Sequence, residues 1–157
     1  MDKKTYKLAI IHPTMTILGG AEVVIIQMAE AWVKRGRAVT IISAGFSKEV
    51  KNRLHKIGCD YKSIKVPFIP GYDTERRNLW IMGLRLRALI KEYDIINCHN
   101  FPANLWVAYA AQFNKNNCAP ILWSCHEPPR YLYEEILNKG LINLEFDPSE
   151  EQPLIIG

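Results

Sequence analysis

The sequence of 157 residues lacks the usual marks of a secreted or membrane-spanning protein. The basic start Met1-Asp-Lys-Lys leads directly into a strand-like run, without the apolar segment and small-residue cleavage site of a signal peptide. The uncharged stretch 95–114 contains Asn, His, Pro and Gln residues, which make it a poor membrane span. The four cysteines show no Cys-x-x-Cys spacing. We therefore expect a cytoplasmic protein with reduced thiols.

Strong charge and the common nucleotide-binding motifs are also absent. A net charge of +4 without a long lysine or arginine run argues against nucleic-acid binding. The chain has no Gly-x-Gly-x-x-Gly and no Walker A motif, and its second strand-like run ends in Ser43-Ala-Gly45, with no acidic residue for a ribose. These absences exclude a typical dinucleotide oxidoreductase. The 48% apolar content and the length suit one folded domain with a real core.

Strand-like and helix-like segments alternate, which is typical of a mainly parallel sheet covered by helices on both faces. The expected strands are 7–12, 39–43, 61–66, 94–98 and 120–124, and the expected helices are 21–35, 48–57, 78–93, 102–113 and 131–139. We predict an α/β, Rossmann-like three-layer sandwich, and right-handed crossovers give it the strand order 3-2-1-4-5. We assign this domain to residues 1–142, and residues 143–157 to an acidic, proline-containing tail that leads toward further chain.

Apolar spacing predicts the buried faces of two helices. In the first helix the stripe is Val24, Met28, Ala31 and Trp32, and Gly36 ends the helix. In helix 78–93 the buried stripe is Leu79, Met82, Leu86, Leu89, Ile90 and Tyr93.

The first strand leads into Gly19-Gly20-Ala21-Glu22 at the start of a helix. Unpaired N–H groups and the helix dipole favour an anion there, and Gly19 and Gly20 allow phosphates to approach the backbone closely. The alternative is an ordinary glycine-containing turn without a ligand. Thr14-Met-Thr16 also keeps open a flavodoxin-like module, which would bind a flavin or another phosphorylated ligand and catalyse no reaction.

Three of the four histidines fall at the carboxyl ends of strands that are neighbours in the predicted sheet. His12 ends the first strand, His99 follows the fourth and His126 follows the fifth. One such histidine is usually a hydrogen-bonded structural residue, but three together indicate a shared crevice at the switch point. Because adjacent strand residues point to opposite faces, Cys98 and Cys125 do not converge with the histidines, and we expect no metal site.

Together these segments resemble the amino-terminal half of GT-B retaining glycosyltransferases of family 4. The segments that carry the resemblance are Ile10-Ile-His-Pro13 with Gly19-Gly-Ala-Glu22, Asp94-Ile-Ile-Asn-Cys-His99, and Trp123-Ser-Cys-His-Glu-Pro-Pro-Arg-Tyr-Leu-Tyr133. The resemblance implies an enzyme of the hexosyltransferase type for carbohydrate or glycan biosynthesis, which moves a sugar from a nucleotide-sugar donor to a glycan or lipid-linked acceptor. It also implies a missing C-terminal donor-binding domain, so the chain alone is expected to be inactive.

The resemblance also implies site residues. Gly19 and Gly20 contact the donor diphosphate, and His126 is the active-site histidine, with a weaker expectation that Glu127 helps to bind the acceptor. Substrate contacts are expected from His12, Glu22, His99 and Arg130, although Glu22 also suits a helix N-terminus and Arg130 suits a solvated surface. No metal or other cofactor is expected.

Segment 67–80 contains both aromatic residues and arginines, and Arg85 and Arg87 lie beyond it. One interpretation is a peripheral contact with anionic headgroups at the inner face of the membrane. The other is an ordinary loop followed by a core-facing helix with solvated charges.

Overall fold

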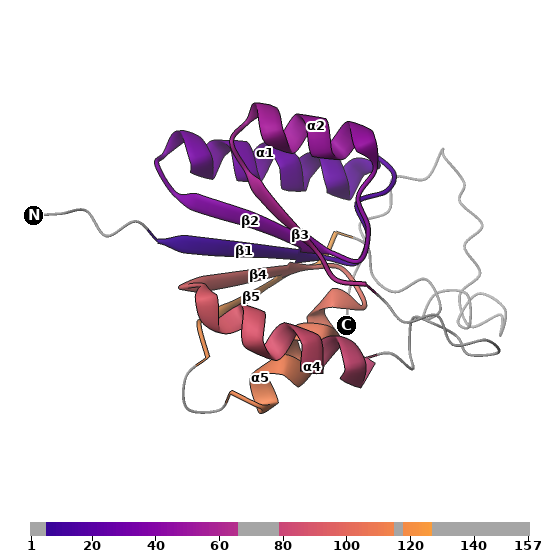
Figure 1. The fold of residues 1–157 in the computed structure, drawn as a ribbon, viewed down its shortest axis with the longest axis vertical. Coiled ribbons are helices and arrows are strands. Elements are labelled where there is room, and N and C mark those ends of the chain that lie inside the picture. The colour runs from indigo at the N-terminus through magenta and orange to yellow at the C-terminus, as the bar shows by residue number, and fades with distance from the viewer. Residues whose placement is uncertain (1–5, 66–78, 115–117, 127–157) are drawn as a thin grey trace, which may run out of the picture.

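The computed structural model describes residues 6–65, 79–114 and 118–126. Five strands form one parallel sheet in the order β3-β2-β1-β4-β5 (Figure 1). They are β1 (Lys7–His12), β2 (Ala38–Ser43), β3 (Asp60–Ser63), β4 (Ile95–His99) and β5 (Ile121–Ser124). The predicted Rossmann-like α/β fold and strand order are confirmed.

Helices cover both faces of this sheet, with α1 and α2 on one side and α4 and α5 on the other (Figure 1). Their bounds are α1 (Gly20–Lys34), α2 (Lys48–Lys56), α4 (Leu79–Leu89), which continues into the 3₁₀ turn η1 (Ile90–Glu92), and α5 (Ala103–Gln112). A hydrophobic core lies on each face of the sheet, and successive residues of β1 point into the two cores alternately. Leu8 and Ile10 pack toward α1, whereas Ala9 and Ile11 pack toward α4 and α5. The sheet is therefore buried on both faces along its central strand.

The buried face of α1 differs from the predicted stripe. Ile25, Ile26 and Ala29 are buried, whereas Val24 is 38% exposed and Trp32 is 40% exposed. Four apolar residues in succession, 23–26, allow two neighbouring stripes, and only the docking of α1 selects one of them. Trp32 instead lines an open groove of about 390 Å³, which Met28, Leu8, Ile95 and Leu122 also line.

The other helix predictions agree with the structure. Met82, Leu86, Ile90 and Tyr93 are buried, and Leu79 and Leu89 pack against the same core. Gly36 ends α1 with a φ of +74°, a conformation that favours glycine. The third strand is shorter than predicted, because its pairing with β2 ends at the Ser43–Ser63 pair.

Several predictions fall outside the described residues: the helix at 131–139, the tail 143–157 and most of the aromatic and arginine patch at 67–78. Within the described part of the chain, none of the helices is long and apolar enough to cross a membrane.

Candidate functional site

The loop after β1 is attached to the loop after β2 through Met15. Met15 is fully buried, its N–H donates to Gly45 O over 2.8 Å, and its carbonyl accepts the N–H of Ser47 over 3.0 Å. Thr16 packs tightly beside Gly45, where a Cβ would lie 3.1 Å from its methyl group. The path from β1 to the glycine turn is therefore held in place by backbone pairing.

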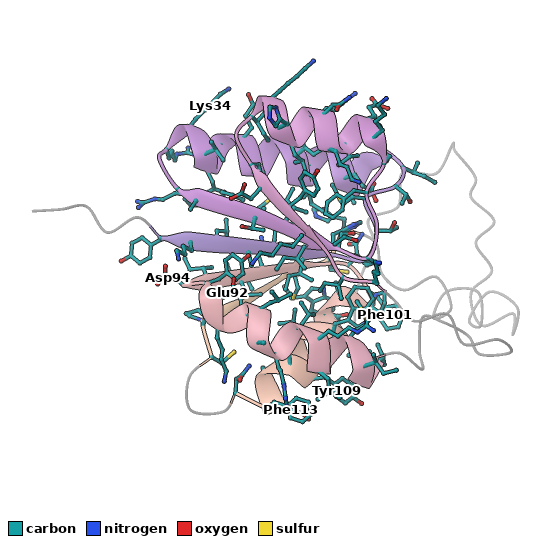
Figure 2. The ribbon with its side chains drawn as sticks, viewed as in Figure 1. Lys34, Glu92, Asp94, Phe101, Tyr109 and Phe113 are labelled. Atoms are coloured by element: carbon teal, nitrogen blue, oxygen red, sulfur yellow. The ribbon has the colours of Figure 1, made fainter. Side chains whose placement is uncertain are left out.

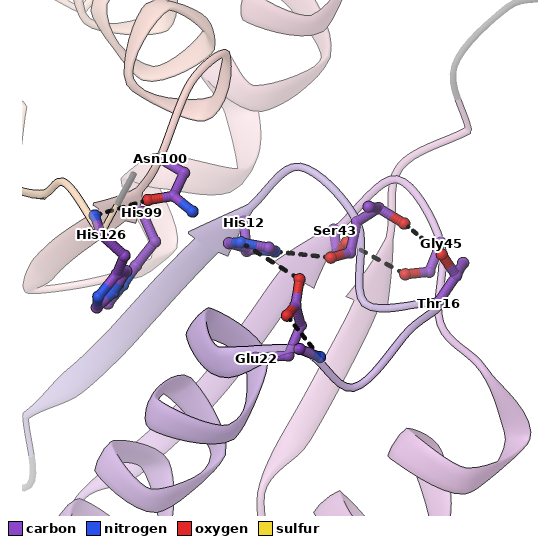
Figure 3. Close-up of polar contacts among 10 residues, drawn as sticks. His12, Thr16, Glu22, Ser43, Gly45, His99, Asn100 and His126 are labelled. Carbon is purple, nitrogen blue, oxygen red and sulfur yellow. Dashed lines mark hydrogen bonds and ion pairs between the residues drawn. The ribbon is translucent and has the colours of Figure 1, made fainter. Parts of the chain in front are cut away.

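Gly19 is the N-cap of α1, and the carboxylate of Glu22 already binds its N–H. Gly19 N–H donates to Glu22 Oε2 over 3.0 Å (Figure 3). This is the capping-box contact in which the side chain of the N3 residue accepts the backbone N–H of the N-cap residue. A Cβ on Gly19 would lie 2.8 Å from the same oxygen, so a larger residue there would require the Glu22 side chain to shift. The amide that the resemblance assigns to the donor diphosphate is thus occupied by an internal carboxylate.

His12 lies at the end of β1, next to this carboxylate. Its Nδ1 lies 2.7 Å from the carbonyl oxygen of Thr14, so Nδ1 carries the hydrogen and donates it. Its Nε2 lies 3.8 Å from Glu22 Oε1. Burial lowers the pKa of His12, although the Thr14 carbonyl and the negative charge of Glu22 oppose that shift. His12 is therefore held in a fixed tautomer against the start of α1.

His99 lies one position beyond Cys98, which pairs with Ile11 in the register of β4 and β1, and His99 therefore lies next to His12. It is fully buried, and its Nδ1 lies 2.7 Å from Nε2 of His126 (Figure 3). Burial, followed by the neighbouring His126 and His12, lowers the pKa of His99 to about 4. The side chain of Cys98 packs in the core on the α4 and α5 side, as strand alternation predicts.

Asn100 holds the backbone of His126 in position. Its side-chain Oδ1 accepts the N–H of His126 over 2.8 Å, and its own N–H donates to Ser124 O over 3.0 Å. The residue has a φ of +58°, which asparagine tolerates better than most residues. Asn100 is not among the site residues predicted from the sequence. The signal available was an asparagine directly after a strand-ending histidine, where the chain must turn.

The structure thus brings together most of the residues singled out from the sequence. His12, Glu22, His99 and His126 lie with the glycine turn at the carboxyl ends of β1, β4 and β5 (Figure 3). Glu127 and Arg130 lie outside the described residues. In the described part of the chain, no group of three or more His, Cys, Asp or Glu residues is arranged to hold a metal ion.

This arrangement is suited to hydrogen bonding with a polar ligand. His12 and His99, whose pKa values are lowered, are neutral near pH 7, and the N-terminus of α1 adds backbone N–H groups and a positive dipole end. His99 is fully buried, and both His99 and His12 use Nδ1 within the chain, so the groups open to a ligand are the exposed imidazole of His126 and the N–H groups at the start of α1.

Among solved structures, the chain resembles glycosyltransferases at low sequence identity. It matches a glycosyltransferase from Rickettsia africae ESF-5 with a TM-score of 0.57 and 16% identity, over 85% of this chain and 34% of that one. It matches HepE from Anabaena, in complex with UDP and glucose, with a TM-score of 0.59 and 17% identity, over 86% of this chain and 34% of that one. This chain therefore spans about a third of the length of these two proteins.

The same fold also occurs outside glycosyltransferases. The C-terminal domain of a hydrogenase from Pyrococcus furiosus matches with a TM-score of 0.56 and 20% identity, over 78% of this chain and 93% of that domain. Structural likeness at such identities shows the fold alone. No curated protein matches the chain.

The sequence itself decides the family. The family model for Glycosyltransferase Family 4 matches residues 18–145, which include the glycine turn, two of the three clustered histidines and the segment that follows β5. This match covers most of the chain. The chain therefore belongs to glycosyltransferase family 4.

Proposed function

We propose that the whole protein transfers a sugar from a nucleotide-sugar donor to a glycan or lipid-linked acceptor, with retention of configuration. This chain supplies the acceptor-side lobe of that enzyme. The observation that carries the proposal is the meeting of His12, His99 and His126 beside the N-terminus of α1, in a chain of family 4. Ligands of open α/β sheets bind at this edge, beyond the carboxyl ends of the strands.

A nucleoside diphosphate sugar is the donor that best fits the glycine turn. The similar structure of HepE holds UDP and glucose, which supports this class of donor. In the proposed complex, N–H groups at the start of α1 face the diphosphate and offset the charge that develops on the leaving nucleotide. No metal ion is needed in this scheme, because the helix dipole and backbone donors supply the electrostatic stabilisation.

Glu22 gives this scheme a specific requirement. Its carboxylate now binds the Gly19 N–H, so a phosphate oxygen can take that amide only if the carboxylate moves away. Gly20, by contrast, has no atom within 4 Å of a Cβ built on it, so the space beside its backbone is open to a ligand. Gly20 is therefore the more accessible of the two proposed diphosphate contacts.

His126 is proposed to bind and orient an oxygen of the reacting sugars. Replacing His126 with alanine removes this contact, and we expect turnover to fall by roughly 10²- to 10³-fold, as for the loss of one preorganised donor. The measurement is sugar transfer by the whole protein, with circular dichroism to show that the variant is folded.

His55 on α2 provides the matched control, because it is exposed and lies outside the histidine cluster. His55→Ala should transfer sugar at the wild-type rate. Near-normal activity of His126→Ala would contradict the proposed role of His126 in the active site.

A further inference from the structure

His99 and His126 share one hydrogen bond, and the position of its proton decides what His126 offers to a ligand. His99 Nδ1 and His126 Nε2 are 2.7 Å apart, whereas the ring centroids are 5.0 Å apart and the ring planes differ by 15°. The ring centroids are much farther apart than the two nitrogens. The rings therefore meet edge to edge and lie nearly in one plane. The contact is therefore a directed hydrogen bond between the rings.

The burial of His99 decides which ring donates. Its Nε2 is buried and has no hydrogen-bond partner in the described part of the chain. A proton on Nε2 would bury an N–H group without an acceptor, which is rare and costly in proteins. A proton on Nδ1 instead makes the hydrogen bond to His126 and leaves only a lone pair unpaired. Because burial lowers the pKa of His99 to about 4, the ring carries a single proton near neutral pH.

We propose that His99 is a positioning residue, which donates its Nδ1–H to His126 Nε2 and so keeps the hydrogen of His126 on Nδ1. A neutral imidazole has one N–H, so a ring that accepts at Nε2 must carry its hydrogen on Nδ1. While His99 donates to Nε2, Nδ1 of His126 is therefore a hydrogen-bond donor.

This inference rests on the proposed function and deepens it. A ring nitrogen that carries hydrogen cannot remove a proton from an acceptor hydroxyl. It binds an oxygen lone pair, either of a sugar hydroxyl or of the phosphate that leaves with the nucleotide. His126 thus serves as a donor that orients an oxygen, and His99 acts on substrate only through His126.

The first test is the histidine tautomers of the ¹⁵N-labelled protein, measured by long-range ¹H–¹⁵N NMR at neutral pH without any substrate. We expect the Nδ1–H form for the neutral His99 ring and a protonated Nδ1 for His126. The exposed His55 serves as the reference for a histidine outside the cluster. A bare Nδ1 on either His99 or His126 would overturn the proposal.

Two variants at position 99 test the coupling. His99→Asn keeps a side-chain N–H donor, so His126 should keep its tautomer and sugar transfer should stay within about fivefold of wild type. His99→Leu removes the donor, so His126 should shift away from the Nδ1–H form and kcat should fall by at least about tenfold, consistent with loss of a positioned catalytic contact. His55→Asn is the matched control and should change neither quantity.

A folded His99→Leu protein in which His126 keeps the wild-type tautomer would overturn the coupling. If that variant does not fold, the wild-type and His99→Asn spectra still decide the tautomers. These spectra need no sugar transfer, so their result stands even if His126→Ala keeps full activity and the proposed function fails.

Discussion

The buried imidazole of His99 makes folding sensitive to mild acid. Its pKa is about 4 in the folded chain, against an ordinary value of 6.5. Above pH 6.5 the ring is neutral in both the folded and the unfolded state. Between pH 6.5 and 4 the unfolded state binds the proton and the folded state does not, so the free energy of unfolding falls as the pH is lowered.

A pKa difference of this size corresponds to on the order of 3 kcal/mol of stability, which is lost progressively between pH 6.5 and 4. Burial of His12 acts in the same direction. We predict that His99→Asn, which cannot titrate, reduces this dependence on pH, as measured by denaturant unfolding at several pH values. His55→Asn should leave the pH dependence as it is in the wild type. An equally steep dependence in His99→Asn would show that His99 is not its source.

Glu22 affects His12 through its charge. The carboxylate lies 3.8 Å from His12 Nε2 and raises the pKa of His12 against the larger effect of burial. Glu22→Gln removes the charge but keeps an oxygen that can accept the Gly19 N–H, so we predict that the pKa of His12 falls further. NMR titration of the His12 ring measures the change. Glu30→Gln, on the same helix, is the control, and an unchanged or higher His12 pKa in Glu22→Gln would contradict the prediction.

The contact between α4 and α5 depends on a glycine. A Cβ on Gly83 would lie 2.5 Å from the Cβ of Tyr109, a residue labelled in Figure 2, and 3.2 Å from the backbone nitrogen of Ala110. The helix α5 therefore approaches α4 more closely than an alanine at position 83 allows. We predict that Gly83→Ala lowers the free energy of unfolding by roughly 1–3 kcal/mol, the usual cost of overpacking. Denaturant unfolding measures this loss.

Gly20→Ala is the matched control, since nothing lies within 4 Å of its added Cβ. At the start of α1 an alanine should leave the protein equally stable or up to about 1 kcal/mol more stable. If Gly83→Ala had the same free energy of unfolding as Gly20→Ala, α4 and α5 would be able to move apart without loss of stability, which would contradict the prediction.

The helices and strands themselves were largely predictable, because local periodicity and turn residues determine them. Met82 and Leu86 recur at helical spacing and are buried as predicted, and Gly36 ends α1 where expected. The face of α1 was predicted wrongly, because its succession of apolar residues fits more than one stripe. The length of β3 depends on where its partner β2 ends, and the local sequence of β3 does not encode that position.

For the whole molecule, we predict that the 157-residue chain alone transfers no sugar. It spans about a third of the length of the two similar glycosyltransferases, and we propose that the main donor-binding surface lies in a further lobe. The measurement is transfer from a nucleotide sugar, with the whole protein as the positive control. Multiple turnovers by the isolated chain, at a rate near that of the whole protein, would contradict the two-lobe proposal.

The sequence by itself determined the α/β class, the strand order and the placement of three histidines at one edge of the sheet. Alternation of segments and right-handed crossovers leave little freedom in these features. Only the tertiary structure decided that Glu22 binds the Gly19 amide, that Asn100 holds His126, and that His99 hydrogen-bonds to His126. The two contacts of His126 join residues 26 and 27 positions apart, so they depend on strand register and side-chain packing, which local sequence patterns do not encode.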